Sequence, residues 1–92
     1  MAVIARSFVV HGRVQGVGFR YFTADQAQSL SVTGWVKNLP GGEVEVYVEG
    51  PEEDVATLLS AVRRGPRASR VDRVDVADRA VTGRHRSFQV TL

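Results

Sequence analysis

Glu43-Val44-Glu45-Val46-Tyr47-Val48-Glu49 is the stretch that decides the fold. Valine fills every second position and glutamate or tyrosine fills the others, which predicts a strand with one apolar and one polar face. Asn38-Leu39-Pro40-Gly41-Gly42, directly before it, is rich in residues that break helices and strands and is predicted to be a turn. Val32–Lys37 is predicted to be the strand that enters this turn. The two strands are therefore expected to form a hairpin.

An amphipathic helix is predicted on each side of this hairpin. The first spans Phe19–Leu30, where apolar residues fall near helical spacing. The second begins at Gly50-Pro51, because proline suits the first helical position and the acidic residues that follow complement a helix N-terminus. Arg63–Arg64 suit its last turn, and Gly65 suits the cap that follows. Its expected buried stripe consists of Val55, Leu58, Leu59 and Val62.

Three further strands complete the pattern, at Val3–His11, Val71–Val76 and Phe88–Leu92, with a loop over Gly65–Arg70 and an exposed turn over Asp78–Arg86. The order β-α-β-β-α-β, with an additional strand near the end, predicts one α+β domain over residues 1–92. Right-handed crossovers around a central hairpin give a ferredoxin-like sandwich, an antiparallel sheet with two helices on one face. The pattern leaves open which of the last two strands lies at the sheet edge.

Composition excludes several classes of protein. A chain of 92 residues with 43% hydrophobic and 24% charged residues is typical of one soluble domain. No apolar run approaches the roughly 20 residues that cross a bilayer, and Met1–Arg6 lacks the core of a signal peptide, so a cytoplasmic protein is expected. The absence of cysteine excludes disulfides and a cysteine nucleophile. His11 and His85 lack the spacing of metal ligands, so no metal site is expected.

Charge is distributed unevenly along the chain, although the net charge is only +2. Residues 43–54 include six acidic side chains and no basic one, whereas residues 63–86 include eight arginines and three aspartates. The basic stretch is open to two interpretations, a surface that faces anions or nucleic acid, or an ordinary solvated surface. The second is favoured, because aromatic residues do not alternate with the arginines as stacking platforms.

Gly12-Arg13-Val14-Gln15-Gly16-Val17-Gly18-Phe19-Arg20 joins the first predicted strand to the first predicted helix. Its three glycines allow positive φ angles and close approach of a ligand to the backbone. Successive N–H groups in such a loop can line one concavity, and the helix adds its free N-terminal N–H groups and positive dipole end. Arg20 offers a planar fork of donors that matches a phosphate. The residues predict an anion-binding loop; the alternative is a glycine-rich corner with an exposed arginine.

Two other phosphate-binding motifs do not fit this stretch. A nucleotide-binding P-loop ends in Gly-Lys-Ser/Thr, whereas this chain has Gly18-Phe19-Arg20. A dinucleotide-binding fingerprint needs a third glycine at the position that Tyr21 occupies.

Three segments resemble motifs of the acylphosphatase family. Gly12–Arg20 matches the family signature Gly-x-Val-Gln-Gly-Val-x-Phe-Arg, and Gly34-Trp35-Val36-Lys37-Asn38 matches Gly-Trp-Val-x-Asn. Glu49-Gly50-Pro51 matches the segment that opens the family's second helix. The resemblance covers essentially the whole chain, with Gly41 as a small departure, because many members have a polar residue there.

The resemblance implies an enzyme that hydrolyses the carboxyl–phosphate bond of small acyl phosphates by in-line attack of water. Arg20 would bind the phosphate and Asn38 would hold the water, without a metal, a cofactor or a covalent intermediate. A monomer without nucleic acid or membrane partners is expected. The phosphate would also be bound by the backbone amides of Gln15, Gly16, Val17, Gly18 and Phe19.

The predicted topology is consistent with these roles. In a split β-α-β unit the first two strands are parallel with one strand between them, so their C-terminal ends lie about 10 Å apart at one sheet edge. The loop follows the first strand and Asn38 ends the second. The alternative role of Asn38 is that of a turn residue, and Trp35 is expected to pack on the sheet.

Two other functions are compatible with this pattern. RNA-binding RRM domains share the element order, but the third strand offers only Tyr47 among glutamates that repel a phosphate backbone. The chain could also be a non-catalytic descendant, or a domain detached from a larger maturation protein. Its short, self-contained length favours a stand-alone enzyme.

Overall fold

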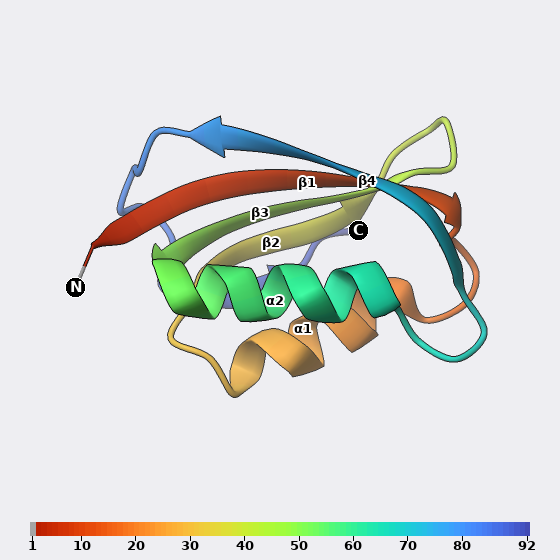
Figure 1. Cartoon of the computed structure of the whole chain (residues 1–92), viewed down its shortest axis with the longest axis horizontal. Coiled ribbons are helices and arrows are strands. Elements are labelled where there is room, and N and C mark those ends of the chain that lie inside the picture. The colour runs from red at the N-terminus through yellow and green to blue at the C-terminus, as the bar shows by residue number, and fades with distance from the viewer. Residues whose placement is uncertain (1) are drawn as a thin grey trace.

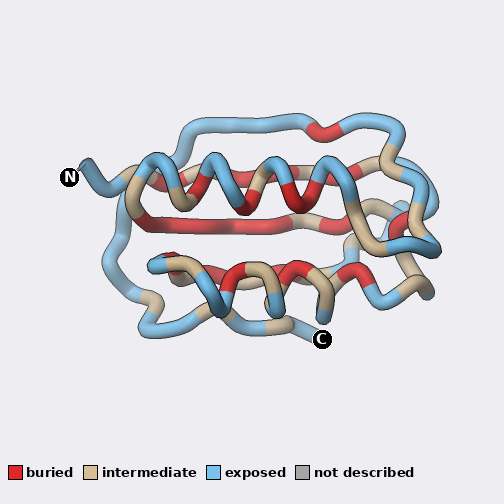
Figure 2. Tube along the Cα trace, turned by 60° about the horizontal axis from the view of Figure 1, so that its bottom comes forward, coloured by how far each residue is buried: buried red, intermediate tan, exposed pale blue. Residues whose placement is uncertain are grey.

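The strand predicted around residues 43–49 is the central strand of a five-stranded sheet. The computed structural model describes residues 2–92 (Figure 1). Two helices cover one face of the sheet, and the other face carries no helix (Figures 1 and 2). No helix within residues 2–92 has the length and apolar character needed to cross a membrane. The elements in chain order are β1 (Val3–Arg13), α1 (Phe19–Gln28), β2 (Thr33–Asn38), β3 (Val44–Pro51), α2 (Glu52–Arg64), β4 (Arg70–Arg79) and β5 (Phe88–Val90).

The strand order β4-β1-β3-β2-β5 places the two strands of uncertain position at opposite edges. β3 pairs antiparallel with both β1 and β2, and β4 pairs antiparallel with β1. The short β5 instead runs parallel to β2, so the sheet is mixed. The ferredoxin-like arrangement is confirmed, and the expected antiparallel pairing holds among the first four strands.

Several element boundaries differ from the predictions, mainly because β1 and β4 pair over a longer stretch. β1 continues to Arg13 past an irregularity between His11 and Gly12, and β4 extends to Arg79 because Asp78 and Arg79 lie opposite β1. At this irregularity Gly12 has a φ of 132°, and a Cβ there would lie 2.1 Å from the carbonyl oxygen of Arg70. Only glycine therefore allows the two strands to approach this closely.

The hydrophobic core lies between the sheet and the helices. Alternate residues of β1 and β3 point into it, as the valine pattern predicted, and both helices contribute from their inner faces. Leu58 and Val62 of α2 are fully buried, whereas Leu59 is partly buried at the margin. The largest fully buried side chains include Phe8, Phe19, Leu58, Val10, Val14 and Val36.

The helix-free face of the sheet carries a buried carboxylate. Glu49 is only 4% exposed, and it accepts hydrogen bonds from the Tyr47 hydroxyl, from both the N–H and the hydroxyl of Thr82, and from the N–H of Gly83. Burial alone would raise the pKa of Glu49, but these donors outweigh it and lower the pKa to about 2. The chain between β4 and β5 is mostly exposed, as predicted, and these bonds fasten it to the sheet.

Glu49 is expected to stabilise the fold in a pH-dependent manner. Its folded pKa of about 2 lies below the ordinary value of 4.5, so its stabilisation is complete above that value and is lost as the pH falls toward 2. The Glu49→Gln variant should have a lower free energy of unfolding at neutral pH and a smaller loss in acid. Urea unfolding at a series of pH values, with Glu45→Gln as the control, measures both effects. Equal acid sensitivity in Glu49→Gln and the parent chain would contradict this account.

Candidate active site

The glycine-rich loop is anchored at both ends by buried side chains. Val14 and Phe19 are almost fully buried in the core, so residues 15–18 form a short arch between two fixed points. Within the arch, Gly16 and Gly18 have φ angles of 74° and 78°, in the left-handed region that favours glycine. Gly18 is also the N-cap of α1. The sequence therefore turns the chain directly from β1 into a helix N-terminus.

The backbone amides of this arch are not used within the protein. Among residues 2–92, no acceptor is hydrogen-bonded to the N–H groups of residues 15–19. A glycine-rich corner with two left-handed residues, followed at once by a helix N-terminus, is the backbone form that binds anions. The structure thus leaves this corner able to accept a tetrahedral anion.

Arg20, the second residue of α1, is half-buried. Its guanidinium donates a hydrogen bond from Nη1 to the carbonyl oxygen of Thr91, at 3.1 Å. The N–H of Thr91 in turn donates to the carbonyl oxygen of Val36 on β2, at 2.8 Å. These two bonds draw the Arg20 side chain toward the last residues of β2.

Asn38 is the last residue of β2 and is exposed. It lies opposite Val44 on β3, and Val44 lies opposite Val10 on β1, so these three residues form one row across the sheet. Two strand spacings separate Asn38 from β1, about 10 Å. Side chains alternate along a strand, so Asn38 shares the helix-covered face with the buried Val36. The amide side chain is therefore on the same side of the sheet as α1.

Gln15 connects the arch to the hairpin that carries Asn38. Its Nε2 donates to the carbonyl oxygens of Leu39, at 2.7 Å, and Glu43, at 2.9 Å. From the sequence, Gln15 was expected to contribute only its backbone amide. The glutamine in the family signature was the only signal for this role. Its acceptors are main-chain oxygens, which come within reach only when the hairpin is folded.

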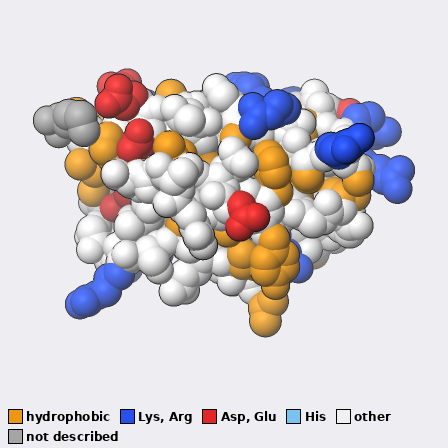
Figure 3. Space-filling view, turned by 90° about the horizontal axis from the view of Figure 1, so that it is seen from below, with side chains coloured by type: hydrophobic (Ala, Val, Ile, Leu, Met, Phe, Trp, Pro, Cys, Tyr) orange, Lys and Arg blue, Asp and Glu red, His pale blue; other side chains and the backbone are white. Residues whose placement is uncertain are grey.

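Basic side chains surround this end of the molecule. The loop after α2 returns beside α1, since a Cβ at Gly65 would lie 3.2 Å from the Phe19 ring. Figure 3 views the molecule from the side where the helices lie. It shows Lys and Arg side chains gathered at the right-hand end, which is the end where β1 leads into α1 in Figure 1. The arginines that the chain path brings to this end are Arg13, Arg63, Arg64, Arg67 and Arg70.

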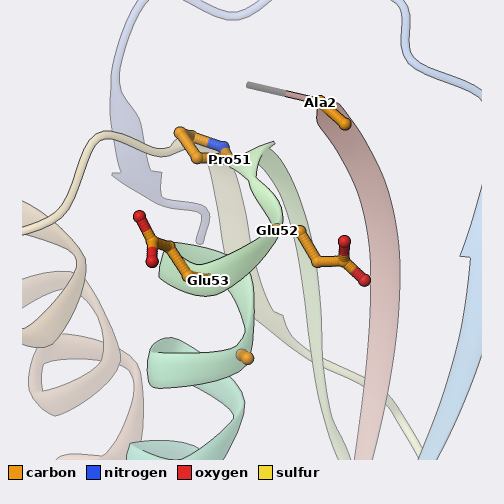
Figure 4. A pocket seen from close by; sticks show the side chains of 5 residues that line it. Ala2, Pro51, Glu52 and Glu53 are labelled. Carbon is orange, nitrogen blue, oxygen red and sulfur yellow. The ribbon is translucent and has the colours of Figure 1, made fainter.

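The opposite end of the molecule is unsuited to phosphate. A cavity of about 430 Å³ lies there at the start of α2, lined by Ala2, Pro51, Ala56 and two glutamates. Figure 4 shows the carboxylates of Glu52 and Glu53 on either side of the first turn of α2. Their negative charges would repel an anionic ligand.

The two histidines are engaged elsewhere. His11 pairs with Asp75 at 2.9 Å, and the His85 ring lies 5.5 Å from the ring of Tyr47. Over the part of the chain that the structure describes, no three His, Cys, Asp or Glu side chains are grouped as metal ligands.

The fold and this corner define a class of protein, a ferredoxin-like α+β domain with a glycine-rich arch between its first strand and first helix. Comparison with known proteins narrows the class. The family model described as Acylphosphatase matches residues 6–90. The acylphosphatase of Methylococcus capsulatus is 50% identical over 89% of each chain, and that of Koribacter versatilis is 46% identical over 92% of this chain and 77% of its own. The chain belongs to the acylphosphatase family.

Solved structures agree with this assignment. The crystal structure of acylphosphatase from Bacillus subtilis superposes with a TM-score of 0.92 at 36% identity, covering 99% of this chain and 100% of that one. Full-length HypF, in a phosphate- and nucleotide-bound form, matches with a TM-score of 0.86 at 28% identity. That match covers 98% of this chain but only 12% of HypF, so the same domain also occurs within a much longer protein.

The bridge from Gln15 generates a test of how the arch is held. Gln15→Ala removes both bonds, but each carbonyl keeps a backbone donor, from Gly42 and Leu39, so a loss of only about 1 kcal/mol is expected. Gln15→Glu should cost more, because a carboxylate would face two carbonyl oxygens. Urea unfolding at neutral pH, with the exposed Gln28→Ala as control, measures the three variants. Gln15→Glu as stable as Gln15→Ala would argue against the bridge.

Proposed function

We propose that this chain hydrolyses small acyl phosphates to a carboxylate and inorganic phosphate, with Arg20 and Asn38 as its catalytic residues. The observation that carries the proposal is the arch at residues 15–18, whose amides, together with that of Phe19, have no protein acceptor among residues 2–92. Arg20 lies in the helix that follows, and Asn38 ends the first strand of the hairpin whose turn is bonded to Gln15 of the arch. Membership of the acylphosphatase family supports this assignment.

The arch and Arg20 bind the transferred phosphoryl group. Phosphoryl transfer depends mainly on positioning and on stabilising charge at the equatorial oxygens. The amides of residues 15–19 and the α1 N-terminus provide fixed dipoles, and Arg20 provides a bidentate fork with a full charge. The Thr91 carbonyl uses only part of that fork, so donors remain for the phosphate.

Asn38 orients the attacking water. Its side-chain amide offers both a donor and acceptor sites, and among residues 2–92 it makes no recorded side-chain hydrogen bond. Lying about 10 Å across the sheet from β1, it leaves room for a phosphoryl group with a water in line behind it. Because the water is already held in a near-attack position, less entropy is lost on reaching the transition state than in the same reaction in solution.

The leaving group explains why so few residues are needed. A carboxylate is a stable anion near neutral pH, so no general acid has to protonate it. Neither the arch nor residues 36–38 carry a histidine or a carboxyl group, so a phosphate oxygen of the substrate takes the proton from water. No step requires a metal ion, a cofactor or a covalent intermediate. The proposed enzyme is a cytoplasmic monomer that acts on a small molecule, without nucleic acid or membrane partners.

Replacing Arg20 tests the assignment directly. Arg20→Ala should lower kcat/KM for benzoyl phosphate roughly 10²–10³-fold, because one charged donor set is lost from the transition state. Arg20→Lys keeps the charge but loses the planar fork, so it should recover only part of the activity. Assays contain EDTA, and circular dichroism confirms that each variant is folded. Near-normal turnover by Arg20→Ala would refute the role of Arg20, and a loss of parent activity in EDTA that a divalent ion restores would refute the metal-free mechanism.

Replacing Asn38 separates water positioning from phosphate binding. Asn38→Ala should lower kcat by about 10²-fold or more, while the inhibition constant of inorganic phosphate changes little. The expected pattern follows because Asn38 contacts the nucleophile rather than the phosphoryl group. Steady-state kinetics with phosphate as a competitive inhibitor measure both quantities. The reverse pattern, weak phosphate binding with unchanged kcat, would make Asn38 a binding residue.

A further inference from the structure

The helix-free face of the sheet carries an aromatic pair at its centre. Trp35 on β2 and Tyr47 on β3 lie directly opposite each other. Their rings are stacked, with centroids 5.8 Å apart and an interplanar angle of 22°. Tyr47 is buried and Trp35 is half-buried, with the Lys37 ammonium 4.9 Å from the centroid of the indole ring. The part of the indole that Tyr47 and Lys37 leave uncovered is therefore the accessible part of this aromatic floor. The sheet itself separates the pair from the helix-covered face, on which Asn38 lies.

The chain between β4 and β5 forms a wall beside this floor. Three of the four hydrogen bonds that Glu49 accepts come from Thr82 and Gly83, and they hold these two residues against the sheet. The residues that follow, Arg84 and His85, line the same cavity as the aromatic pair, and the His85 ring lies 5.5 Å from that of Tyr47. The wall is fixed in the folded chain, so little ordering would be needed when a ligand binds.

Two adjoining cavities lie between floor and wall, of about 390 and 380 Å³. Trp35, Arg84 and His85 line both cavities. The cavity of about 390 Å³ is also lined by Arg79, and the cavity of about 380 Å³ by Arg86. We call them together the open-face pocket. Each volume is within the range of sites for small organic ligands.

The open-face pocket is cationic. Neither cavity has a carboxylate among its lining residues. Across residues 2–92, Arg79, Arg84 and Arg86 form no ion pair with a carboxylate, and Arg79 instead lies over the Tyr47 ring at 5.5 Å. The two nearby carboxylates are already engaged, Glu49 by its four donors and Glu45 by Lys37 at 3.9 Å.

We propose that the open-face pocket is a second binding site, which takes a planar aromatic anion. A ring would lie against Trp35 and His85, and an acidic group elsewhere on the same molecule would pair with Arg84. Stacking on aromatic side chains and charge-assisted hydrogen bonds from arginine are the interactions that recognise such a molecule. The site lies on the opposite face from the proposed catalytic arch and does not depend on its activity.

Trp35 makes the proposal directly measurable, because it is the only tryptophan in the chain. The probe is AMP, which combines a planar ring with a phosphate. AMP is titrated while tryptophan emission is recorded, in the presence of saturating inorganic phosphate to occupy the arch, with free tryptophan as the correction for absorbance. A saturable change in emission is expected. Adenosine should bind about tenfold more weakly, because it lacks the group that pairs with Arg84. Inorganic phosphate alone should leave the emission unchanged.

Variants complete the test. Arg84→Ala should weaken AMP binding about tenfold, whereas Arg73→Ala, which removes an exposed arginine of β4 that pairs with Asp75, should not. Calorimetry measures the same affinities without relying on Trp35, and both variants should hydrolyse benzoyl phosphate like the parent chain. The proposal is overturned by the absence of saturable binding at millimolar AMP in saturating inorganic phosphate, or by an unchanged affinity in Arg84→Ala.

Discussion

The backbone hydrogen bonds on both sides of β3 are the constraint on which the rest of the structure depends. By pairing antiparallel with β1 and with β2, β3 makes those two strands parallel and holds them one strand apart. The chain leaves β1 through the arch and leaves β2 at Asn38, so both reach the same end of the sheet. The distance across that end is set by two ladders of main-chain bonds rather than by flexible side chains. A rigid scaffold of this kind allows a loop and an amide to act on one small molecule.

Much of this arrangement could be predicted from the sequence, because the deciding signals are local. The alternation of valine in β3 identifies the central strand, and the glycines of the arch identify a corner with unusual backbone angles. The signals that predict the helices are equally local, since the sequence of α2 itself contains charged residues suited to each end and an apolar stripe. The similarity to acylphosphatase motifs then assigned roles to Arg20 and Asn38, which stay predictions. The structure shows where Arg20 and Asn38 lie in the fold and which residues surround them.

The features that escaped prediction all depend on partners far apart in the chain. Whether β5 runs parallel to β2 depends on how residues 80–87 cross the sheet, and that path depends on the donors that Glu49 meets. The bridge from Gln15 to the hairpin spans more than twenty residues, and its acceptors are carbonyl groups that have no signature in the sequence. The sequence alone predicts one surface for the basic stretch at residues 63–86, but the fold divides it. Some of its arginines lie at the end with the arch, and others line the open-face pocket.

The unpaired amides of the arch have a thermodynamic consequence. Dipoles fixed in space attract any oxyanion of suitable shape, and on the proposed function the product of the reaction is itself such an anion. A ligand that binds only the native chain shifts the folding equilibrium by mass action. Accumulated orthophosphate would therefore slow the enzyme and at the same time protect it from denaturation. Catalytic output and resistance to heat would then respond in opposite directions to the same metabolite.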